Sequence, residues 1–224
     1  MLTIEQLSVD LAGANVLRGV SVQWQAGTTV AVVGRNGAGK TTLLRAVMGL
    51  VRAKAGRVRL DAHELLGLPA HRRAEFGIGY APEDRIIYPT LNVQENLRLP
   101  CEVQRLAEAD IRQRLGAVLD VVPQLKDLLG RPGAGLSGGQ GKMVALGRAL
   151  MIGQRIVLLD EPFQGLAPVL AMQYAEALGR LRQVRPQLCV VITESNASLL
   201  GRIPNQTLTL ERGALQAAPM STAA

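Results

Sequence analysis

Hydrophobic and polar positions alternate along two stretches near the start of the chain. These are residues 2–10 (LTIEQLSVD) and residues 19–24 (GVSVQW), and a period of two is typical of a β-strand that buries one face. Residues 28–34 (TTVAVVG) are instead a continuous run rich in β-branched side chains and closed by a glycine. This run predicts a parallel strand that is covered on both faces.

Helical patterns follow. A short helix is expected from residue 41 to near Gly49, and helical character is expected between about residues 90 and 130. Apolar residues recur at roughly helical spacing in that middle region at Val103, Leu106, Ile111, Leu115, Val118, Leu119 and Val122. A later helix is expected to begin near Pro168, because proline suits the first turn of a helix. It carries the apolar residues Leu170, Tyr174, Leu178 and Leu181.

Further strands complete the pattern. Residues 56–65 (GRVRLDAHEL) predict an edge hairpin, residues 155–161 (RIVLLDE) and 188–194 (LCVVITE) predict buried strands, and residues 206–216 predict a terminal ladder. Strands that alternate with helices indicate an α/β fold with a parallel sheet. The helix-rich middle indicates a lobe inserted into that fold.

Composition narrows the class of protein. The chain has 224 residues, of which 48% are hydrophobic, so it can bury the core of one domain. Its first residues carry acids and no apolar run of the kind found in a secretory signal, and no segment approaches the roughly 18 apolar residues of a membrane span. We therefore expect a cytoplasmic chain, or one that a partner holds at a membrane.

Charge and cysteine content exclude other classes. The net charge is +7, but the basic residues are scattered and aromatic residues make up only 3% of the chain, so a solvated basic surface is favoured over a nucleic-acid groove. Cys101 and Cys189 are too few for a disulfide framework, and Cys189 is expected to be a buried reduced thiol. His63 and His71 are expected at the surface.

A glycine-rich loop offers the first candidate chemistry. Residues 34–41 (GRNGAGKT) match the pattern G-x-x-x-x-G-K-[ST] between a predicted strand and a predicted helix. The glycines permit a tight loop whose amides form an anion nest, and the helix start adds its positive end. Lys40 is expected to bind the β and γ phosphates, and Thr41 is expected to ligate Mg²⁺. The alternative interpretation of this loop is a glycine turn that merely joins strand to helix. The predicted nucleotide-binding residues here are Gly34, Arg35, Asn36, Gly37, Ala38, Gly39, Lys40, Thr41 and Thr42.

Two adjacent acids end the strand at residues 155–161. A phosphate site of this kind needs a carboxylate at the end of a neighbouring parallel strand to hold the metal and its waters. Asp160 is the predicted metal-side carboxylate, and Glu161 is the predicted general base for the attacking water. An ordinary strand terminus is the alternative, and the glycine-rich loop makes it the weaker one.

The stretch LSGGQ, residues 136–140, precedes another predicted helix. Ser137 can donate a hydrogen bond, Gly138 and Gly139 leave the backbone open, and the helix start faces outward. This is a second phosphate-binding arrangement. Because one nucleotide does not need two such arrangements in one domain, we expect Ser137 to Gln140 to complete a nucleotide site on another subunit. The alternative is a glycine helix cap with a polar loop.

These three motifs, in this order, make the chain resemble the ATP-binding subunit of an ABC transporter. The resemblance implies a P-loop NTPase (RecA-like) core with an antiparallel β lobe and an inserted helical lobe. In a single domain of residues 1–224, the core and β lobe would occupy residues 1–84 and 148–224, and the helical lobe about residues 85–147. It also implies that two such domains hold two ATP molecules head to tail.

The stretch FGIGYAPEDRIIYPTLNVQENL, the run GRALM and the motif GLAP at residues 165–168 resemble the ATPases of branched-chain amino acid and urea importers. This resemblance implies a second ATPase subunit, identical or different, a pair of transmembrane permease subunits and, indirectly, a periplasmic solute-binding protein. It places the chain at the cytoplasmic face of the inner membrane, with no nucleic-acid partner. Residues 80–100 would contact the permease.

The chain departs from the family pattern at several positions. Leu11 stands where many relatives place an aromatic that stacks on adenine, so about 1 to 3 kcal/mol of stacking is expected to be lost. Glu83 stands where a glutamine usually touches Mg²⁺ and the water, with Arg85 near enough in sequence to offset its charge. Ser195 stands where most relatives place a histidine that holds the γ-phosphate. The motif GLAP replaces the more usual aspartate-containing turn.

Leu11, Glu83 and Ser195 together leave a second interpretation open, namely a regulatory module that binds nucleotide without hydrolysing it. A non-transport ABC ATPase with weak hydrolysis, serving DNA repair or translation, is a further alternative. Such proteins usually need a long coiled coil or tandem ATPase domains, for which 224 residues leave no room. A P-loop kinase would leave LSGGQ unexplained.

Overall fold

The computed structural model describes residues 1–201 and 203–216, which form two sheets and a group of helices. The strands are β1 (Leu2–Leu11), β2 (Ala14–Trp24), β3 (Thr29–Val33), β4 (Ala55–Leu60), β5 (His63–Glu64), β6 (Ile78–Ala81), β7 (Ile156–Asp160), β8 (Cys189–Glu194), β9 (Gln206–Glu211) and β10 (Ala214–Leu215). The α-helices are α1 (Lys40–Val47), α2 (Ala70–Arg73), α3 (Val93–Val103), α4 (Glu108–Val121), α5 (Gly138–Ile152) and α6 (Pro168–Val184). Short 3₁₀ segments are η1 (Ala74–Phe76), η2 (Pro123–Leu128), η3 (Gly133–Gly135) and η4 (Ala197–Leu200).

The larger sheet has the strand order β10-β9-β3-β8-β7-β6. Strands β9, β3, β8, β7 and β6 run parallel, and β10 pairs antiparallel with β9. Val30, Ala31 and Val32 in the centre of β3 are fully buried, as expected for a strand covered on both faces. The predicted parallel sheet is therefore confirmed, and β3 and β7 end at the same edge of it.

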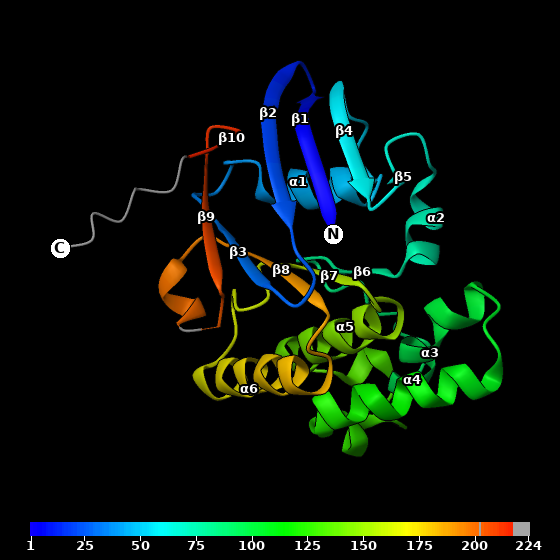
Figure 1. Cartoon of the computed structure of the whole chain (residues 1–224). Helices are drawn as coiled ribbons and strands as arrows, with labels where there is room; N and C mark the ends of the chain where they lie inside the picture. The colour runs from blue at the N-terminus through cyan, green and yellow to red at the C-terminus, as the bar shows by residue number, and fades with distance from the viewer. Residues whose placement is uncertain (202, 217–224) are drawn as a thin grey trace.

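The smaller sheet is antiparallel, with the order β2-β1-β4-β5. The predicted edge hairpin is present, because β4 and β5 pair antiparallel with Leu60 opposite His63. Figure 1 shows this sheet and α1 on one side of the parallel sheet, and α3, α4, α5 and α6 on the other side. The chain therefore forms three layers with the parallel sheet in the middle.

Alternate side chains of the parallel strands pack into two different cores. Ala31, Val157 and Ile192 pack with the helices α3 to α6 in one core. Val30 and Leu158 pack with α1 and the antiparallel sheet in the other. Because successive residues of a strand point to opposite faces, one sheet holds both the helical layer and the antiparallel layer in place.

The helical middle of the chain differs in detail from the sequence pattern. Helix α3 ends at Val103, whose side chain is 72% exposed, and Arg105 takes a left-handed conformation (φ 55°) before α4 begins. Leu106 therefore lies in a turn between two helices. The proposed division between the lobes remains a prediction, and its boundary at residue 147 lies inside α5.

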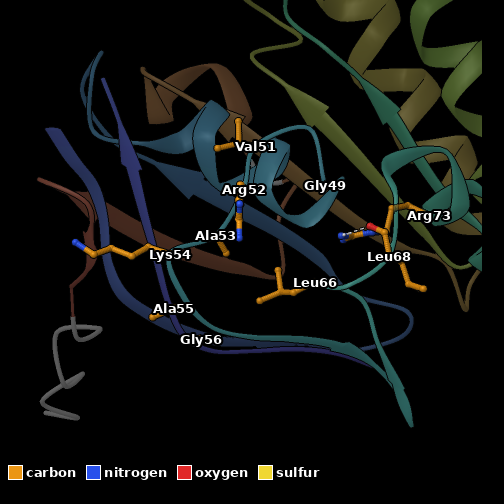
Figure 2. A pocket seen from close by; sticks show the side chains of 10 residues that line it. All are labelled: Gly49, Val51, Arg52, Ala53, Lys54, Ala55, Gly56, Leu66, Leu68 and Arg73. Atoms are coloured by element: carbon orange, nitrogen blue, oxygen red, sulfur yellow. Dashed lines mark hydrogen bonds between the residues drawn. The ribbon is translucent and has the colours of Figure 1, made fainter. Parts of the chain in front are cut away.

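A hollow of about 390 Å³ lies beside the end of α1 (Figure 2). The buried Arg73 side chain lines it and donates to the backbone oxygens of Val47 and, at 3.2 Å, of Leu68. Val47 is the last residue of α1, so the guanidinium caps the negative end of that helix. None of the residues that line this hollow belongs to the glycine-rich loop.

Candidate functional site

The glycine-rich loop, residues 34–42, joins β3 to the start of α1. Gly37 and Gly39 have positive φ values of 81° and 107°, which side-chain-bearing residues rarely adopt. A Cβ added to Gly39 would meet the backbone oxygen of Val16 at 3.0 Å, whereas one on Gly37 would meet nothing within 4 Å. The loop is thus closely backed by β2 at one glycine and open at another, as a cradle for an anion requires.

Lys40 is buried at the first position of α1. Its ammonium donates to the backbone oxygens of Gly34 at 2.7 Å and of Arg35 at 3.2 Å. It also lies 3.0 Å from Oε1 of Glu161, and the two side chains are only 3% and 6% exposed. The loop therefore wraps around its own cation, and the carboxylate at the end of β7 neutralises that cation.

Asp160 gathers three hydroxyl groups. Its Oδ1 accepts from Thr41 at 3.1 Å and from Thr193 at 2.7 Å, and its Oδ2 accepts from Tyr80 at 3.1 Å. The parallel register places Asp160 directly opposite Thr193 on β8. The sequence motifs named Thr41 and Asp160 but not Tyr80 or Thr193, whose roles depend on which strands are neighbours.

Glu161 is held by backbone contacts on several sides. Its φ is positive, 45°, and its amide donates to the Thr193 hydroxyl at 3.1 Å. Its backbone oxygen accepts from Lys142 of α5 at 2.7 Å, and its Oε2 accepts from the exposed Ser195 hydroxyl at 3.4 Å. Ser195 thus lies beside Glu161, although this bond is long, and its predicted place at the γ-phosphate stays a prediction.

Glu83 is connected to Glu161 through the side chain of Gln164. Because the Gln164 side-chain amide faces two carboxylates, we assign its nitrogen to the side toward them, where it donates to Glu83 Oε1 at 2.7 Å and to Glu161 Oε2 at 3.2 Å. Both Glu83 and Gln164 are exposed. Arg85 does not serve Glu83 with a hydrogen bond among the described residues, and it donates instead to the backbone oxygen of Gly138 at 2.9 Å.

Glu194 is a buried acid that the motif analysis overlooked. Its side chain is fully buried, Oε1 accepts from the Phe163 amide at 2.8 Å, and Oε2 has no hydrogen-bond partner. Burial raises the pKa of this carboxyl from its ordinary value to about 7. An acid at the end of the apolar run CVVITE was the available signal.

The stretch LSGGQ starts α5 and forms a reciprocal helix cap. The Gln140 amide donates to the Ser137 hydroxyl at 3.3 Å, and the Ser137 amide donates to Gln140 Oε1 at 3.0 Å. Ser137 and Gly138 are exposed. Across residues 1–201 and 203–216, no hydrogen bond or salt bridge joins residues 136–140 to the glycine-rich loop.

Leu11 ends β1 at the turn into β2, where it pairs with Ala14 and is 39% exposed. His63 and His71 are exposed and Cys189 is a buried free thiol, as predicted, and Cys101 is also buried and free. The structure thus brings Lys40, Thr41, Asp160, Glu161, Ser195 and, through Gln164, Glu83 into one cluster. In the stretch 136–140 Ser137 and Gly138 are exposed and Gly139 is buried, and within the described residues no hydrogen bond joins this stretch to that cluster.

The fold and this cluster define a P-loop ATPase, because a phosphate loop, a lysine and two strand-end carboxylates meet at one edge of a parallel sheet. Residues 17–164, more than half of the chain, match the family model described as ABC transporter. The chain therefore belongs to the ABC transporter family. It is an ATP-hydrolysing, nucleotide-binding subunit of the ABC type.

The curated relatives all belong to this family, but their names give different transported substances. The chain is 34% identical over 213 residues to the high-affinity branched-chain amino acid transport ATP-binding protein BraG of Pseudomonas aeruginosa, covering 95% of this chain and 90% of that protein. It is also 34% identical over 199 residues to the lipopolysaccharide export system ATP-binding protein LptB of Haemophilus influenzae, covering 88% and 80%.

A solved structure of an ATP-binding subunit of an ABC transporter superposes with a TM-score of 0.83 at 28% identity, covering 97% of this chain and 88% of that one. Cassettes of this family form dimers and pair with transmembrane components. Within the described part of this chain, none of the helices has the length and apolar character needed to cross a membrane.

Proposed function

We propose that this chain hydrolyses Mg-ATP in a head-to-tail pair of cassettes and thereby drives an importer of branched-chain amino acids, related amino acids or urea. The observation that carries the catalytic part is the buried contact between Lys40 and Glu161 at 3.0 Å. It joins a phosphate-binding cation and a carboxylate at the mouth of the glycine-rich loop. Both groups have parts to play in ATP hydrolysis.

Lys40 and the amides of residues 34–42 would bind the phosphates of ATP. In the structure the Lys40 ammonium is held by Gly34, Arg35 and Glu161, so phosphate oxygens would replace these partners one for one. Because the pocket is buried, such charge-assisted contacts are stronger than they would be in water. Leu11, exposed at the β1–β2 turn, would give the adenine an apolar contact without stacking.

Magnesium fits the oxygen atoms at the end of β7. Thr41 would supply a hydroxyl and Asp160 a carboxylate 3.1 Å from it. Glu83, which Gln164 joins to Glu161, would add a second carboxylate, and oxygen donors of this kind are what a hard cation prefers. Tyr80 and Thr193 would orient Asp160 from behind. When bound, Mg²⁺ neutralises charge on the phosphates.

Glu161 would act as the general base that orients and deprotonates the attacking water. Once phosphate oxygens take over Lys40, Oε1 of Glu161 is released while Oε2 keeps its contacts with Ser195 and Gln164. Ser195 has one hydroxyl hydrogen, so donating it to a phosphate oxygen would replace its bond to Glu161 and would bring no positive charge. The base is thus positioned by neutral groups and freed by the substrate.

Ser137, Gly138, Gly139 and Gln140 would complete a nucleotide site on a second cassette. The helix start at Gly138 is exposed, and Ser137 receives a hydrogen bond through its oxygen while its own hydroxyl hydrogen stays available to donate. These features support a phosphate contact in trans. The second cassette would be a copy of this chain or a related ATPase.

The transported solute is inferred from relatives and from the motifs around residues 76–97 and 165–168. The relative named for branched-chain amino acid transport is matched over 95% of this chain. In this proposal the chain lies at the cytoplasmic face of the inner membrane, against two permease subunits, and a periplasmic binding protein delivers the solute. Residues 80–100 would contact the permease.

Lipopolysaccharide export is the second candidate, because LptB is matched at the same 34% identity, over 88% of this chain. Purification of the chain from native membranes, followed by identification of its membrane partners, separates the two candidates. Partners of the amino acid permease type, with a solute-binding protein, support import. Partners that carry lipopolysaccharide would overturn it.

The catalytic proposal is tested by steady-state hydrolysis of Mg-ATP over a wide range of protein concentration, with the Glu161→Gln variant as the blank. A specific rate above the blank that rises with concentration supports composite sites formed between identical chains. A rate at the level of the blank throughout, even with ATP bound, would contradict hydrolysis by this chain alone. Repeating the assay with the copurified second ATPase then decides whether a different partner is required.

A further inference from the structure

Two carboxylates from different loops meet at a single side-chain amide. Glu83 follows β6 and Glu161 follows β7, and both accept hydrogen bonds from the Gln164 nitrogen, at 2.7 Å and 3.2 Å. An amide nitrogen has two hydrogens, so it can serve both acceptors at once. Gln164 is thus the described side chain that bridges the predicted general base and the loop at residues 82–85.

We propose that Gln164 is a positioning residue that fixes the Glu161 carboxylate for hydrolysis and ties it to Glu83. The inference rests on the proposed function of Glu161 as general base. Gln164 acts through Glu161 and does not touch the reacting atoms. Its contribution belongs to the rate of the chemical step and not to the binding of ATP.

The charges around Glu161 explain why an amide is needed here. Oε1 of Glu161 is paired with Lys40, a contact that ATP would take away. Oε2 then keeps only Gln164 at 3.2 Å and Ser195 at 3.4 Å. Since Glu83 brings a second negative charge to the same amide, a neutral donor between the two carboxylates stabilises both, whereas a third acid would repel them.

The turn after β7 holds Gln164 in place. The backbone N–H of Gln164 donates to the backbone oxygen of Glu161 at 3.3 Å, and Gly165 continues the turn with φ 69°. Phe163, just before it, is buried and anchored to Glu194 at 2.8 Å. An exposed side chain on a tightly held turn is well suited to orient a neighbour, because its backbone does not move.

The test compares Gln164→Leu, Gln164→Glu and Gln164→Asn with the wild type. Leucine keeps the bulk and removes the donor, glutamate keeps the shape and adds a charge, and asparagine keeps the donor on a shorter side chain. The matched controls are Gln183→Leu and Gln183→Glu, which make the same changes at an exposed glutamine near the end of α6. The readouts are kcat for Mg-ATP, the Kd for ATP by calorimetry, and the melting temperature.

We expect Gln164→Leu to lower kcat about tenfold, as the loss of a hydrogen bond to a charged group implies, with the Kd for ATP unchanged within about twofold. Gln164→Glu should lower kcat further, and Gln164→Asn should lie between leucine and the wild type. The Gln183 variants should match the wild type. A residue that only fills the loop would give the opposite pattern, because the isosteric glutamate would then be harmless.

Two failures are distinguishable. If the wild type turns over ATP well above the Glu161→Gln blank and Gln164→Leu retains its kcat, the inference is wrong and the proposed function stands. A parallel loss of kcat, ATP binding and melting temperature would also overturn the positioning role, since it would show general damage. If the wild type itself stays at the blank, with its second ATPase present, the proposed function fails and the inference falls with it.

Discussion

The glycine-rich loop and the stretch LSGGQ are built from similar residues, yet the structure treats them differently. The loop at residues 34–42 lies against β7, and its Lys40 is buried against Glu161. In residues 136–140 the start of the helix is exposed at Ser137 and Gly138, and Ser137 and Gln140 bond to each other in a helix cap. The first helix start has its lysine neutralised by Glu161, which is distant in the chain, whereas the second is capped by residues of its own first turn.

Two glycine-rich helix starts in one chain can thus differ in burial and in the contacts that satisfy them. A buried lysine must be neutralised within the chain, because a buried charge without a partner is costly. A helix start at the surface has no such need, because water satisfies its amides until a ligand arrives. The first arrangement already joins its lysine to a carboxylate, and the second leaves Ser137 and Gly138 exposed for the contact with another cassette that we propose.

The largest effect is expected from Glu161→Gln, which removes the carboxylate that faces Lys40 in the glycine-rich loop. We expect turnover of ATP to fall about a thousandfold, as the loss of a general base implies, while ATP binds at least as tightly because the rival for Lys40 loses its charge. Hydrolysis of radiolabelled ATP and calorimetry measure the two effects. Asp127→Asn, the same change at an exposed acid, is the control, and normal turnover in Glu161→Gln would remove Glu161 from the mechanism.

The part played by LSGGQ is tested by mixing two inactive variants. Lys40→Ala removes the loop cation and Ser137→Arg blocks the exposed helix start, so each variant alone is expected to lose about 99% of its turnover. If identical chains pair head to tail, an equal mixture forms half mixed dimers with one intact site each and recovers about a quarter of wild-type activity. A mixture that stays inactive would argue against composite sites between identical chains.

The buried carboxyl of Glu194, at the end of β8, is expected to make the stability of the chain depend on pH. Burial raises its pKa from 4.5 to about 7, so between those values the folded chain keeps a proton that the unfolded chain has released. Stability from this group is therefore present below pH 4.5, falls as the pH rises to 7, and is constant above it.

Glu194→Gln is expected to remove that dependence. Its free energy of unfolding relative to the wild type should improve by about 3 kcal/mol between pH 4.5 and pH 8. Urea unfolding at both pH values measures this change, with Asp127→Asn as the exposed control. An equal difference at both pH values would show that Glu194 keeps an ordinary pKa.

The smallest effect is expected where LSGGQ and α5 contact the loop that follows β6. Arg85 donates to the backbone oxygen of Gly138 at 2.9 Å, and Arg148 of α5 donates to the backbone oxygen of Ile86 at 2.5 Å. Arg85→Ala should therefore loosen LSGGQ and lower kcat about threefold, with ATP binding unchanged. Arg112→Ala, at an exposed position of α4, is the control. A change in ATP affinity alone would place Arg85 in a different role.

Much of the fold was predictable because its signals are local. The continuous run at residues 28–34 became the buried β3, and Pro168 does begin α6. The prediction for the helical region around residues 90–130 was less accurate, because spacing alone does not reveal the turn at Arg105 or the exposure of Val103. Such a break depends on how the chain packs against its neighbours and not on periodicity.

Most strands and helices, the phosphate loop and the pair of acids at residues 160 and 161 could be predicted from the sequence, because they depend on residue type and short-range spacing. The contacts of Thr193 and Tyr80 with Asp160, the bridge from Glu83 through Gln164 to Glu161, and the missing second partner of Glu194 are visible only in the folded chain. These contacts arise from the order of parallel strands, which brings distant strand ends to one edge of the sheet. No local pattern encodes which strand ends become neighbours.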